Sequence, residues 1–266
     1  MNIIGLFLAL LIGLILGLIG GGGSILTVPL VQYFFNKPTY EATTYSLMVV
    51  TIAALFGVLQ RLNQNLFAWR EALIFVIPSM LVAFAIRLLV IPEEIAVWGK
   101  MFSRDELISF LLVVVMVYVA LRMLFPKSTI EHAKPLNTKV LKIVAMGLLT
   151  GILSGFLGAG GGFIIVPILV SLGLEMKKAI ATSMLIVTVQ SAVALSGDYI
   201  NKISTGGLNL DYKLVIWLSI LTVLGVFIGT HFQRKVTGIF LRRMFALVLI
   251  IVAIGIAFDH LLQKIG

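Results

Sequence analysis

The chain has 266 residues, of which 60% are hydrophobic and only 12% charged, and its formal net charge is +9. A soluble domain is nearer half apolar and a quarter charged, so this composition, with a mean hydropathy of +1.14, predicts a multi-pass membrane protein in a lipid bilayer. The basic residues lie in short loops between apolar runs, which is typical of membrane topology rather than nucleic-acid binding. The lack of cysteine excludes disulfides, thiolate metal sites and cysteine catalysis.

Eight apolar runs of membrane length predict an all-α polytopic protein. Six of them have about 20 residues, but the first and the fifth are too long for one straight crossing of a hydrocarbon core about 30 Å thick. Glycines interrupt both long runs. We therefore predict a first repeat (1–125), a cytoplasmic linker (126–139) and a second repeat (140–266). Each repeat has a broken helix and three spans: 2–35 followed by 42–60, 71–91 and 106–125, then 140–172 followed by 179–197, 212–232 and 241–262.

The two halves match when the first is shifted by 138 positions along the chain. The shift places Gly13, Gly17, Gly20, Gly22, Gly23, Val28 and Pro29 on Gly151, Gly155, Gly158, Gly160, Gly161, Val166 and Pro167. After a one-residue gap, "EATTYSLMVVT" (41–51) lies over "KAIATSMLIVT" (178–188). The chain is therefore predicted to be a tandem repeat, a common way to build transporters.

The distribution of Lys and Arg favours an inverted relation between the repeats. If each long segment crosses the membrane once, the basic residues divide equally between the two sides. If each turns back, as a re-entrant hairpin or as two short spans, 13 of the 20 lie on one side. Each half then has an odd number of crossings, which inverts one half relative to the other. This topology places both termini outside the cytoplasmic (inner) membrane of the cell.

The segment "LGLIGGGGSILTVPLV" (16–31) and its partner "GILSGFLGAGGGFIIVPILV" (151–170) carry the candidate site. Such dense glycine releases backbone N–H groups from the helix, and the following helices are expected to start near Ser24 and Phe163, with their positive dipole ends facing the break. Such an end binds anions, although a tight turn without a ligand is the structural alternative. Hydroxyl and amide side chains from the next spans would add donors. The candidate anion-binding residues are Gly20, Gly21, Gly22, Gly23, Ser24, Thr43, Thr44, Ser46, Gly158, Gly160, Gly161, Gly162, Thr182, Ser183 and Gln190.

Three G-x-x-x-G pairs occur elsewhere in the apolar runs. Small residues at this spacing let membrane helices approach closely, so we interpret the pairs as packing positions. They would also allow a homodimer, although nothing specifies its interface. The pairs are Gly13 with Gly17, Gly151 with Gly155, and Gly225 with Gly229.

Ionisable residues are nearly absent from the middle of the spans. Arg87 lies near the end of its span, where it is expected to snorkel to the interface. Asp198 and Glu41 are weak candidates for a proton relay, and a solvated charge at a span end is the expected role of each. Coupling to a proton or to sodium is therefore left open by the sequence.

Enzyme motifs are incomplete in this chain. "GAGGGF" lacks the last glycine of a dinucleotide-binding fingerprint, and "GGGGS" lacks the lysine of a P-loop. No H-x-x-x-H motif or carboxylate pair lies in the middle of a span. We predict a protein that is not an enzyme and has no metal site, cofactor or nucleic-acid partner.

The paired glycine-rich segments with their Val-Pro, each followed by "ATTYSL" or "AIATSM", resemble the sulfite exporter TauE/SafE family over essentially the whole chain. The resemblance implies export, or in some members uptake, of small sulfur-containing or organic anions such as sulfite and sulfonates. The copies differ where Tyr45 matches Thr182 and Ser24 matches Gly162. The expected function is a secondary transporter that exports such an anion by alternating access. An anion channel and a non-transporting membrane scaffold are the alternatives.

Overall fold

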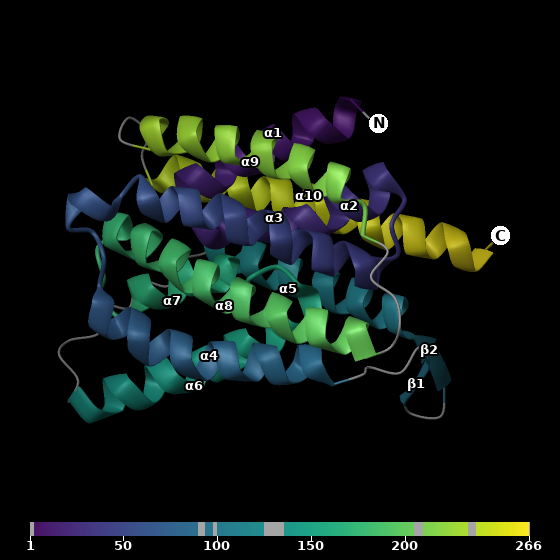
Figure 1. The fold of residues 1–266 in the computed structure, drawn as a ribbon, viewed down its shortest axis with the longest axis horizontal. Helices are drawn as coiled ribbons and strands as arrows, with labels where there is room; N and C mark the ends of the chain where they lie inside the picture. Colours follow the sequence, from purple (N-terminus) through teal and green to yellow (C-terminus); the bar gives the residue numbers. More distant parts are fainter. Residues whose placement is uncertain are drawn as a thin grey trace.

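A computed structural model describes residues 3–89, 94–97, 100–124, 136–204, 210–233 and 238–265. The long helices lie side by side along one bundle (Figure 1). The elements are α1 (Ile3–Ile19), η1 (Gly21–Leu26), α2 (Thr27–Phe35), α3 (Thr39–Leu59), η2 (Leu62–Gln64), α4 (Trp69–Leu88), β1 (Glu94–Val97), β2 (Lys100–Ser103), α5 (Arg104–Leu124), α6 (Leu136–Leu157), α7 (Gly162–Ser171), α8 (Met176–Ser204), α9 (Tyr212–Phe232) and α10 (Gly238–Ile265). The all-helical prediction is confirmed except for β1 and β2, a short antiparallel hairpin that the sequence analysis did not predict.

Among the described residues, six helices are long and apolar enough to cross a membrane, which confirms the multi-pass prediction. They are Thr39–Leu59, Trp69–Leu88, Arg104–Leu124, Val140–Leu157, Met176–Asn201 and Tyr212–Phe232. Large apolar side chains remain exposed on their outer faces, for example Ile216, Ile220 and Leu224, which follow one another by one turn of α9. Apolar surface of this extent needs an apolar surrounding, here the lipid.

Each glycine-broken segment reverses the direction of the chain. After α1 the chain turns at Gly20, where φ is 85°, and α2 returns beside α1. The ring of Phe35 packs against Gly5, where an added Cβ would lie 2.8 Å from the ring. The turn between α6 and α7 uses Gly158, Gly160 and other glycines with φ near 65°, a backbone conformation that glycine adopts without steric cost. Helix α7 has 10 residues and so spans about 15 Å, roughly half the hydrocarbon core.

Three predicted boundaries are wrong. The regular helix after the first break starts at Thr27 rather than near Ser24, because residues 21–26 form a tighter 3₁₀ turn in which the Ser24 hydroxyl donates to the Gly21 carbonyl at 2.6 Å. Helix α6 starts at Leu136, inside the segment predicted as linker. Helix α8 continues to Ser204 instead of ending at 197, and the polar side chains of Asp198 and Asn201 in this extension are buried.

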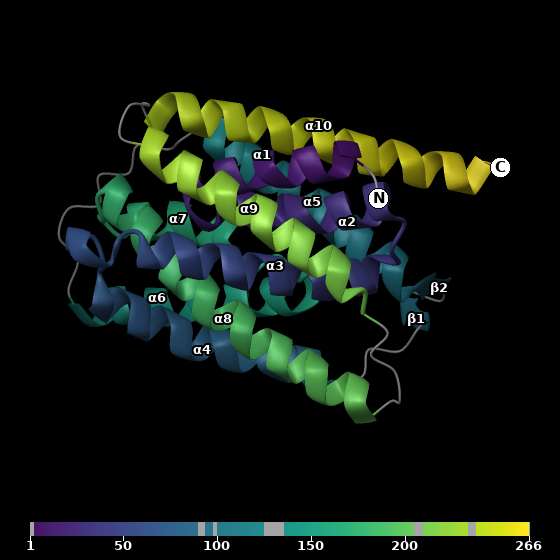
Figure 2. The same cartoon turned by 45° about the horizontal axis from the view of Figure 1, so that its top comes forward.

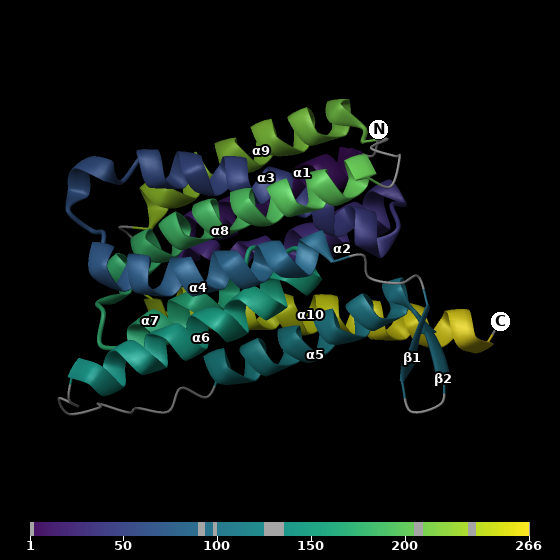
Figure 3. The same ribbon diagram turned by 60° about the horizontal axis from the view of Figure 1, so that its bottom comes forward.

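Helices of the predicted first repeat pack mainly on helices of the predicted second repeat. Helix α1 packs against α9, and its repeat counterpart α6 packs against α4, the counterpart of α9. The pairs α3 with α8 and α5 with α10 also join equivalent helices (Figure 2). Counterparts run in opposite directions along the bundle, as α5 and α10 do in Figure 3. As a result, α1 starts and α10 ends at the same end of the bundle.

The G-x-x-x-G pairs lie at these inter-repeat contacts, which confirms their interpretation as packing positions. A Cβ on Gly13 would collide with the Thr222 carbonyl, and one on Gly17 would lie 2.5 Å from the Val226 carbonyl oxygen. Gly225 and Gly229 face the backbone of α1 in return, and Gly151 and Gly155 pack against α4 in the same way. The pairs thus mediate packing between helices of this one chain.

Candidate functional site

The two glycine breaks meet in the centre of the bundle, where η1 packs against α7. A Cβ added to Gly21 would lie 2.5 Å from the Cα of Gly162, and one added to Gly162 would collide with the backbone of Gly21. No side chain separates the two segments at this point. We call this backbone contact the crossing. It brings together two breaks that are 138 positions apart in sequence.

Backbone amide groups are available beside the crossing. The first amides of α7 that donate to the preceding turn are those of Ile164 and Ile165, both to the Gly161 carbonyl, at 3.1 and 3.3 Å. The amides before them have no acceptor within the helix, because the start of any α-helix leaves its first N–H groups unpaired. On the other side of the crossing, the Gly21 amide donates to the Ser183 hydroxyl at 3.4 Å. The start of α7 therefore presents amide donors, as an anion requires, whereas the Gly21 amide already has a partner.

Side chains from α8 border both breaks. The position of a Cβ on Gly20 lies 2.7 Å from the Ser183 hydroxyl oxygen, and that on Gly160 lies 2.6 Å from the Ser191 hydroxyl oxygen. The amide nitrogen of Gln190 lies 3.4 Å from the Cβ position of Gly161. The structure thus places predicted residues Ser183 and Gln190 beside the glycines, and adds Ser191. Predicted residues Gly22, Gly23 and Ser24 lie within η1.

Other predicted residues make contacts away from the crossing. The Thr182 hydroxyl accepts a hydrogen bond from the Ala68 amide at 3.0 Å and so ties α8 to the start of α4. Thr43 lies against Gly158, but it and Thr44 also bond to the charged cluster described below. The Ser46 side chain is buried in α3.

The predicted hydroxyl and amide side chains are all buried, at 0–2% exposure. Within the part of the chain that the structure describes, the hydroxyls of Ser46 and Ser191 and the Oε1 atom of Gln190 have no hydrogen-bond partner. Buried polar atoms in proteins nearly always have one. The unsatisfied atoms of Ser191 and Gln190, which border the second break, are therefore expected at a site that binds a polar ligand or water.

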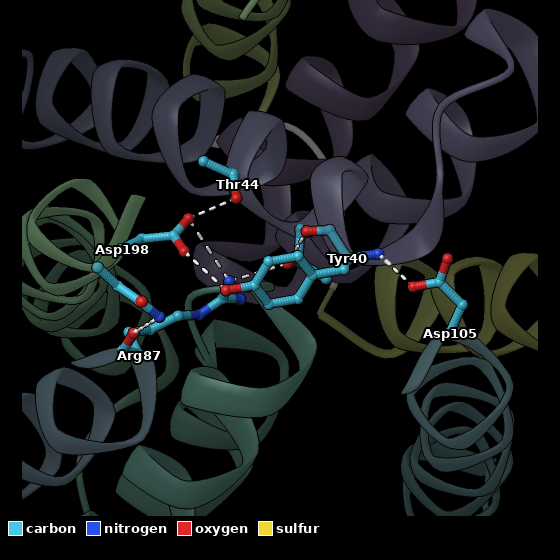
Figure 4. Close-up of polar contacts among 7 residues, drawn as sticks. Tyr40, Thr44, Arg87, Asp105 and Asp198 are labelled. Carbon is cyan, nitrogen blue, oxygen red and sulfur yellow. Dashed lines mark hydrogen bonds and ion pairs between the residues drawn. The ribbon is translucent and has the colours of Figure 1, made fainter. Parts of the chain in front are cut away.

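A buried charged cluster was missed by the sequence analysis. Arg87 of α4 and Asp198 of α8 form an ion pair with 3.7 Å between Nη1 and Oδ2, and their side chains are only 2% and 0% exposed. The Asp198 carboxylate also accepts hydrogen bonds from the hydroxyls of Tyr40, at 3.3 Å, and Thr44 (Figure 4). The predictions that Arg87 snorkels to the interface and that Asp198 is solvated are both wrong. Glu41, the other weak candidate, is half-buried.

The cluster stays buried because α8 is longer than predicted. The additional turns keep Asp198 against α4, and the Asn201 side chain donates to the Arg87 carbonyl at 3.2 Å. One signal in the sequence could have indicated a special position. With the register of 137 that aligns the spans after the breaks, Asp198 matches Arg61, so both repeats carry a charge there.

Arg61 is the second buried cation and lies at the end of α3. Its guanidinium donates to the carbonyls of Gly57 and Gly17, at 3.0 and 2.8 Å, and to the side-chain carbonyl of Gln233, at 2.8 Å. Burial lowers the pKa of Arg61 to about 10. The group is therefore still cationic at neutral pH, and it joins the ends of α1, α3 and α9.

The chemistry of the centre suits an anion better than a metal. Its groups are backbone amides, hydroxyls, a carboxamide and a guanidinium. Within the described ranges, no three His, Cys, Asp or Glu side chains lie close enough together to hold a metal ion.

Apolar helices that can cross a membrane, with polar side chains buried between them, define a multi-pass membrane protein. The chain belongs to the family described as "Sulfite exporter TauE/SafE", whose model matches residues 5–256. This confirms the resemblance seen in the glycine-rich segments. The family and the names of the relatives point to transporters, and not to enzymes.

Three relatives of the chain are described as probable membrane transporter proteins. A "Probable membrane transporter protein" of Xylella fastidiosa is 34% identical over 182 residues, which cover 66% of each chain and thus just under two thirds of that relative. The "Probable membrane transporter protein MJ0441" of Methanocaldococcus jannaschii is 23% identical over 91% of each chain. The "Probable membrane transporter protein YdhB" of Bacillus subtilis is 24% identical over 87% of this chain and 90% of its own. No solved structure matches the chain significantly.

Proposed function

We propose that this protein is a secondary transporter that exports a small sulfur-containing or organic anion, such as sulfite or a sulfonate, across the cytoplasmic membrane. The observation that carries the proposal is the crossing, where Gly21 and Gly162 make backbone contact among buried hydroxyls. The family description indicates that the substrate contains sulfur and that the direction of transport is export. Geometry alone supports the broader class of small anions.

The anion would bind between the two breaks. Sulfite and sulfonate groups each offer three acceptor oxygens, and loop amides in such turns suit oxyanions of this kind. Amides of 20–23 and 158–162 would bind one face, and Gln190 would add a donor from α8. Ser183 would add another only by releasing the Ile180 carbonyl, to which its hydroxyl donates at 2.8 Å. Ser46, Thr43 and Thr44 are the corresponding candidates on α3. The Thr43 and Thr44 hydroxyls already donate, to the Tyr40 carbonyl and to Asp198, whereas the Ser46 hydroxyl has no partner among the described residues. Thr182 is the weakest member of the predicted set because its hydroxyl lies against the start of α4, away from the crossing.

Transport would occur by alternating access of two inverted repeats. The candidate side chains are buried, so an ion reaches them only when helices move. This favours a carrier over a channel, which needs an open path. Opposite directions of counterpart helices, and chain ends at one end of the bundle, support an inverted arrangement with both termini on one side (Figure 3). The distribution of Lys and Arg favours the outside for that side. A reporter fused to the C-terminus that proves cytoplasmic would contradict this arrangement.

Purified protein in liposomes tests the function. We expect radiolabelled ethanesulfonate to enter at a rate that saturates with concentration and exceeds that of empty liposomes about tenfold or more. Unlabelled sulfite should compete with it. Gly160→Val should abolish this uptake while the protein still inserts, because Gly160 has φ +64° and its side-chain position lies 2.6 Å from the Ser191 hydroxyl; each of these costs on the order of 1–3 kcal/mol.

The alternatives give different results in the same vesicles. Flux that rises linearly with concentration would indicate an anion channel. Absence of uptake for sulfite, sulfonates and small carboxylates, together with no shift in thermal stability on adding them, would indicate a scaffold. Gly255→Ala is the control, because Gly255 is exposed on α10 with nothing within 4 Å of its Cβ position.

A further inference from the structure

The Arg87 side chain reaches the second glycine break. Its Nη2 atom lies 2.7 Å from the Cβ position of Gly158. Within the described part of the chain, Nε and Nη2 have no hydrogen-bond partner, although the side chain is only 2% exposed. A buried guanidinium with unused donors is costly unless another group satisfies it. The unused donors lie where the proposed anion would bind.

The two breaks differ in the polar and charged groups beside them. Beside Gly158, the Thr43 hydroxyl accepts from Arg87 Nη1 at 2.9 Å, and the unpartnered Ser191 hydroxyl borders the nearby Gly160. Beside Gly20, the repeat counterpart of Gly158, the contacts are the Ser183 hydroxyl and Ile180. The guanidinium thus favours the second break as the side of the crossing that binds the charged end of a substrate.

Asp198 is the resting counter-ion of this guanidinium. The pair is loose, because 3.7 Å between nitrogen and oxygen is beyond hydrogen-bond distance. Tyr40 and Thr44 of α3 donate hydroxyl groups to the same carboxylate. Farther out, α5 places the Arg104 guanidinium 3.9 Å from the centre of the Tyr40 ring, and the Asp105 carboxylate accepts from the Tyr40 amide at 2.9 Å. Figure 4 shows Asp198 between Thr44 and Arg87.

We propose that Arg87 binds the anionic group of the substrate at the second break and that Asp198 takes up one proton when the anion arrives, so that anion and proton cross the membrane together, outward or inward according to their combined gradients. This inference rests on the proposed anion transport. With the site empty, Arg87 and Asp198 neutralise each other. A monoanion would leave two negative charges facing one positive charge in a buried site, which is costly. Protonation of the Asp198 carboxylate restores neutrality, and release of both ions regenerates the pair.

Proteoliposomes with a pH gradient test this coupling. The probe is ethanesulfonate, whose sulfonate stays ionised over the pH range of the assay, so proton movement reports on the protein. Wild type should accumulate ethanesulfonate from the acidic side, with alkalinisation of that side. Asp198→Asn should retain exchange of labelled for unlabelled ethanesulfonate but lose gradient-driven accumulation by about tenfold or more. Arg87→Gln should raise the KM for exchange by about tenfold or more, because it loses a charge-assisted contact.

A double variant separates binding from folding. Arg87→Gln with Asp198→Asn removes both charges, so it should fold even where a single variant leaves an unpaired buried charge. We expect it to be monodisperse but deficient in ethanesulfonate exchange and in proton coupling. Arg122→Gln and Glu175→Gln, both exposed, are the matched controls and should behave as wild type.

Two results would overturn the inference alone: wild-type exchange and coupling in the double variant, or gradient-driven accumulation in Asp198→Asn equal to that of wild type. Either would mean that the pair is structural while transport stands. No ethanesulfonate or sulfite transport by wild type would overturn the proposed function, and this inference with it.

Discussion

Gly162→Ala is expected to reduce ethanesulfonate transport about tenfold or more, although it adds a single methyl group. The new Cβ collides with the backbone of Gly21, which cannot rotate away as a side chain could. The two breaks must then separate, so the amides on the two sides of the crossing no longer point toward the same bound anion. Gly162 starts α7 and its φ lies outside the left-handed region, so alanine is disfavoured there only by the close approach. Initial uptake rates, corrected for the amount of inserted protein, measure the effect.

Two other glycines serve as matched controls for Gly162. Gly173 has φ +93° with nothing within 4 Å of its Cβ position, so Gly173→Ala adds backbone strain without a collision. We expect a loss of about 1–2 kcal/mol in stability, with transport retained. Gly255→Ala adds neither strain nor collision and should change stability by no more than about 1 kcal/mol. Wild-type transport by Gly162→Ala would contradict the role of the crossing.

Gly225→Leu is expected to have the largest effect on the folded state. A Cβ at this position collides with the Leu10 carbonyl, and the next carbon atoms would push α9 away from α1. This contact is the main inter-repeat interface of α1, so the variant should lose about 3 kcal/mol or more. For a chain of this size, that corresponds to a fall in apparent Tm of roughly 6–12 °C in detergent. Thermal unfolding followed by tryptophan fluorescence measures it.

The control for this interface lies on the lipid-facing side of the same helix. Leu224→Ala removes an exposed side chain next to Gly225 in sequence and should change the Tm of the detergent-solubilised protein by only a few degrees. If Gly225→Leu unfolds at the same temperature as Leu224→Ala, the close packing of α1 and α9 does not limit stability.

Local patterns predicted several features of this structure correctly. The shift of 138 residues matched the two breaks, and the positive φ at Gly20 and Gly158 explains why glycine stands at both. The G-x-x-x-G spacing predicted close packing, which Gly13 and Gly225 show. These features depend on residues near one another in sequence, or on a repeat that sequence comparison reveals directly.

The charged cluster could not be predicted in the same way. Arg87 and Asp198 are 111 positions apart in sequence, and each lies near the end of an apolar run. Whether such a residue faces water or another helix depends on how α4 packs against α8, which no local pattern encodes. The start of α2 was misplaced for a different, local reason, since the bond from the Ser24 hydroxyl to the Gly21 carbonyl tightens the turn beyond what glycine content alone indicates.

The crossing and the cluster together suggest how the fold relates binding to movement. The glycines let the two breaks come into backbone contact, which positions amides from both repeats around one point. The Arg87 side chain of α4 reaches the second break, and Asp198 of α8 forms an ion pair with Arg87. Helices of both repeats thus contribute groups to the same small volume, so the affinity for a ligand there would depend on the relative position of these helices.

Localising a bound substrate tests the central claim most directly. Crystals of the protein with 2-bromoethanesulfonate would show the bromine by anomalous scattering. We predict one peak at the crossing, with sulfonate oxygens about 3 Å from amides of 20–23 or 158–162. A peak only at the protein surface, or no peak at the crossing under conditions where the same compound is transported, would contradict the claim that the glycine breaks form the anion site.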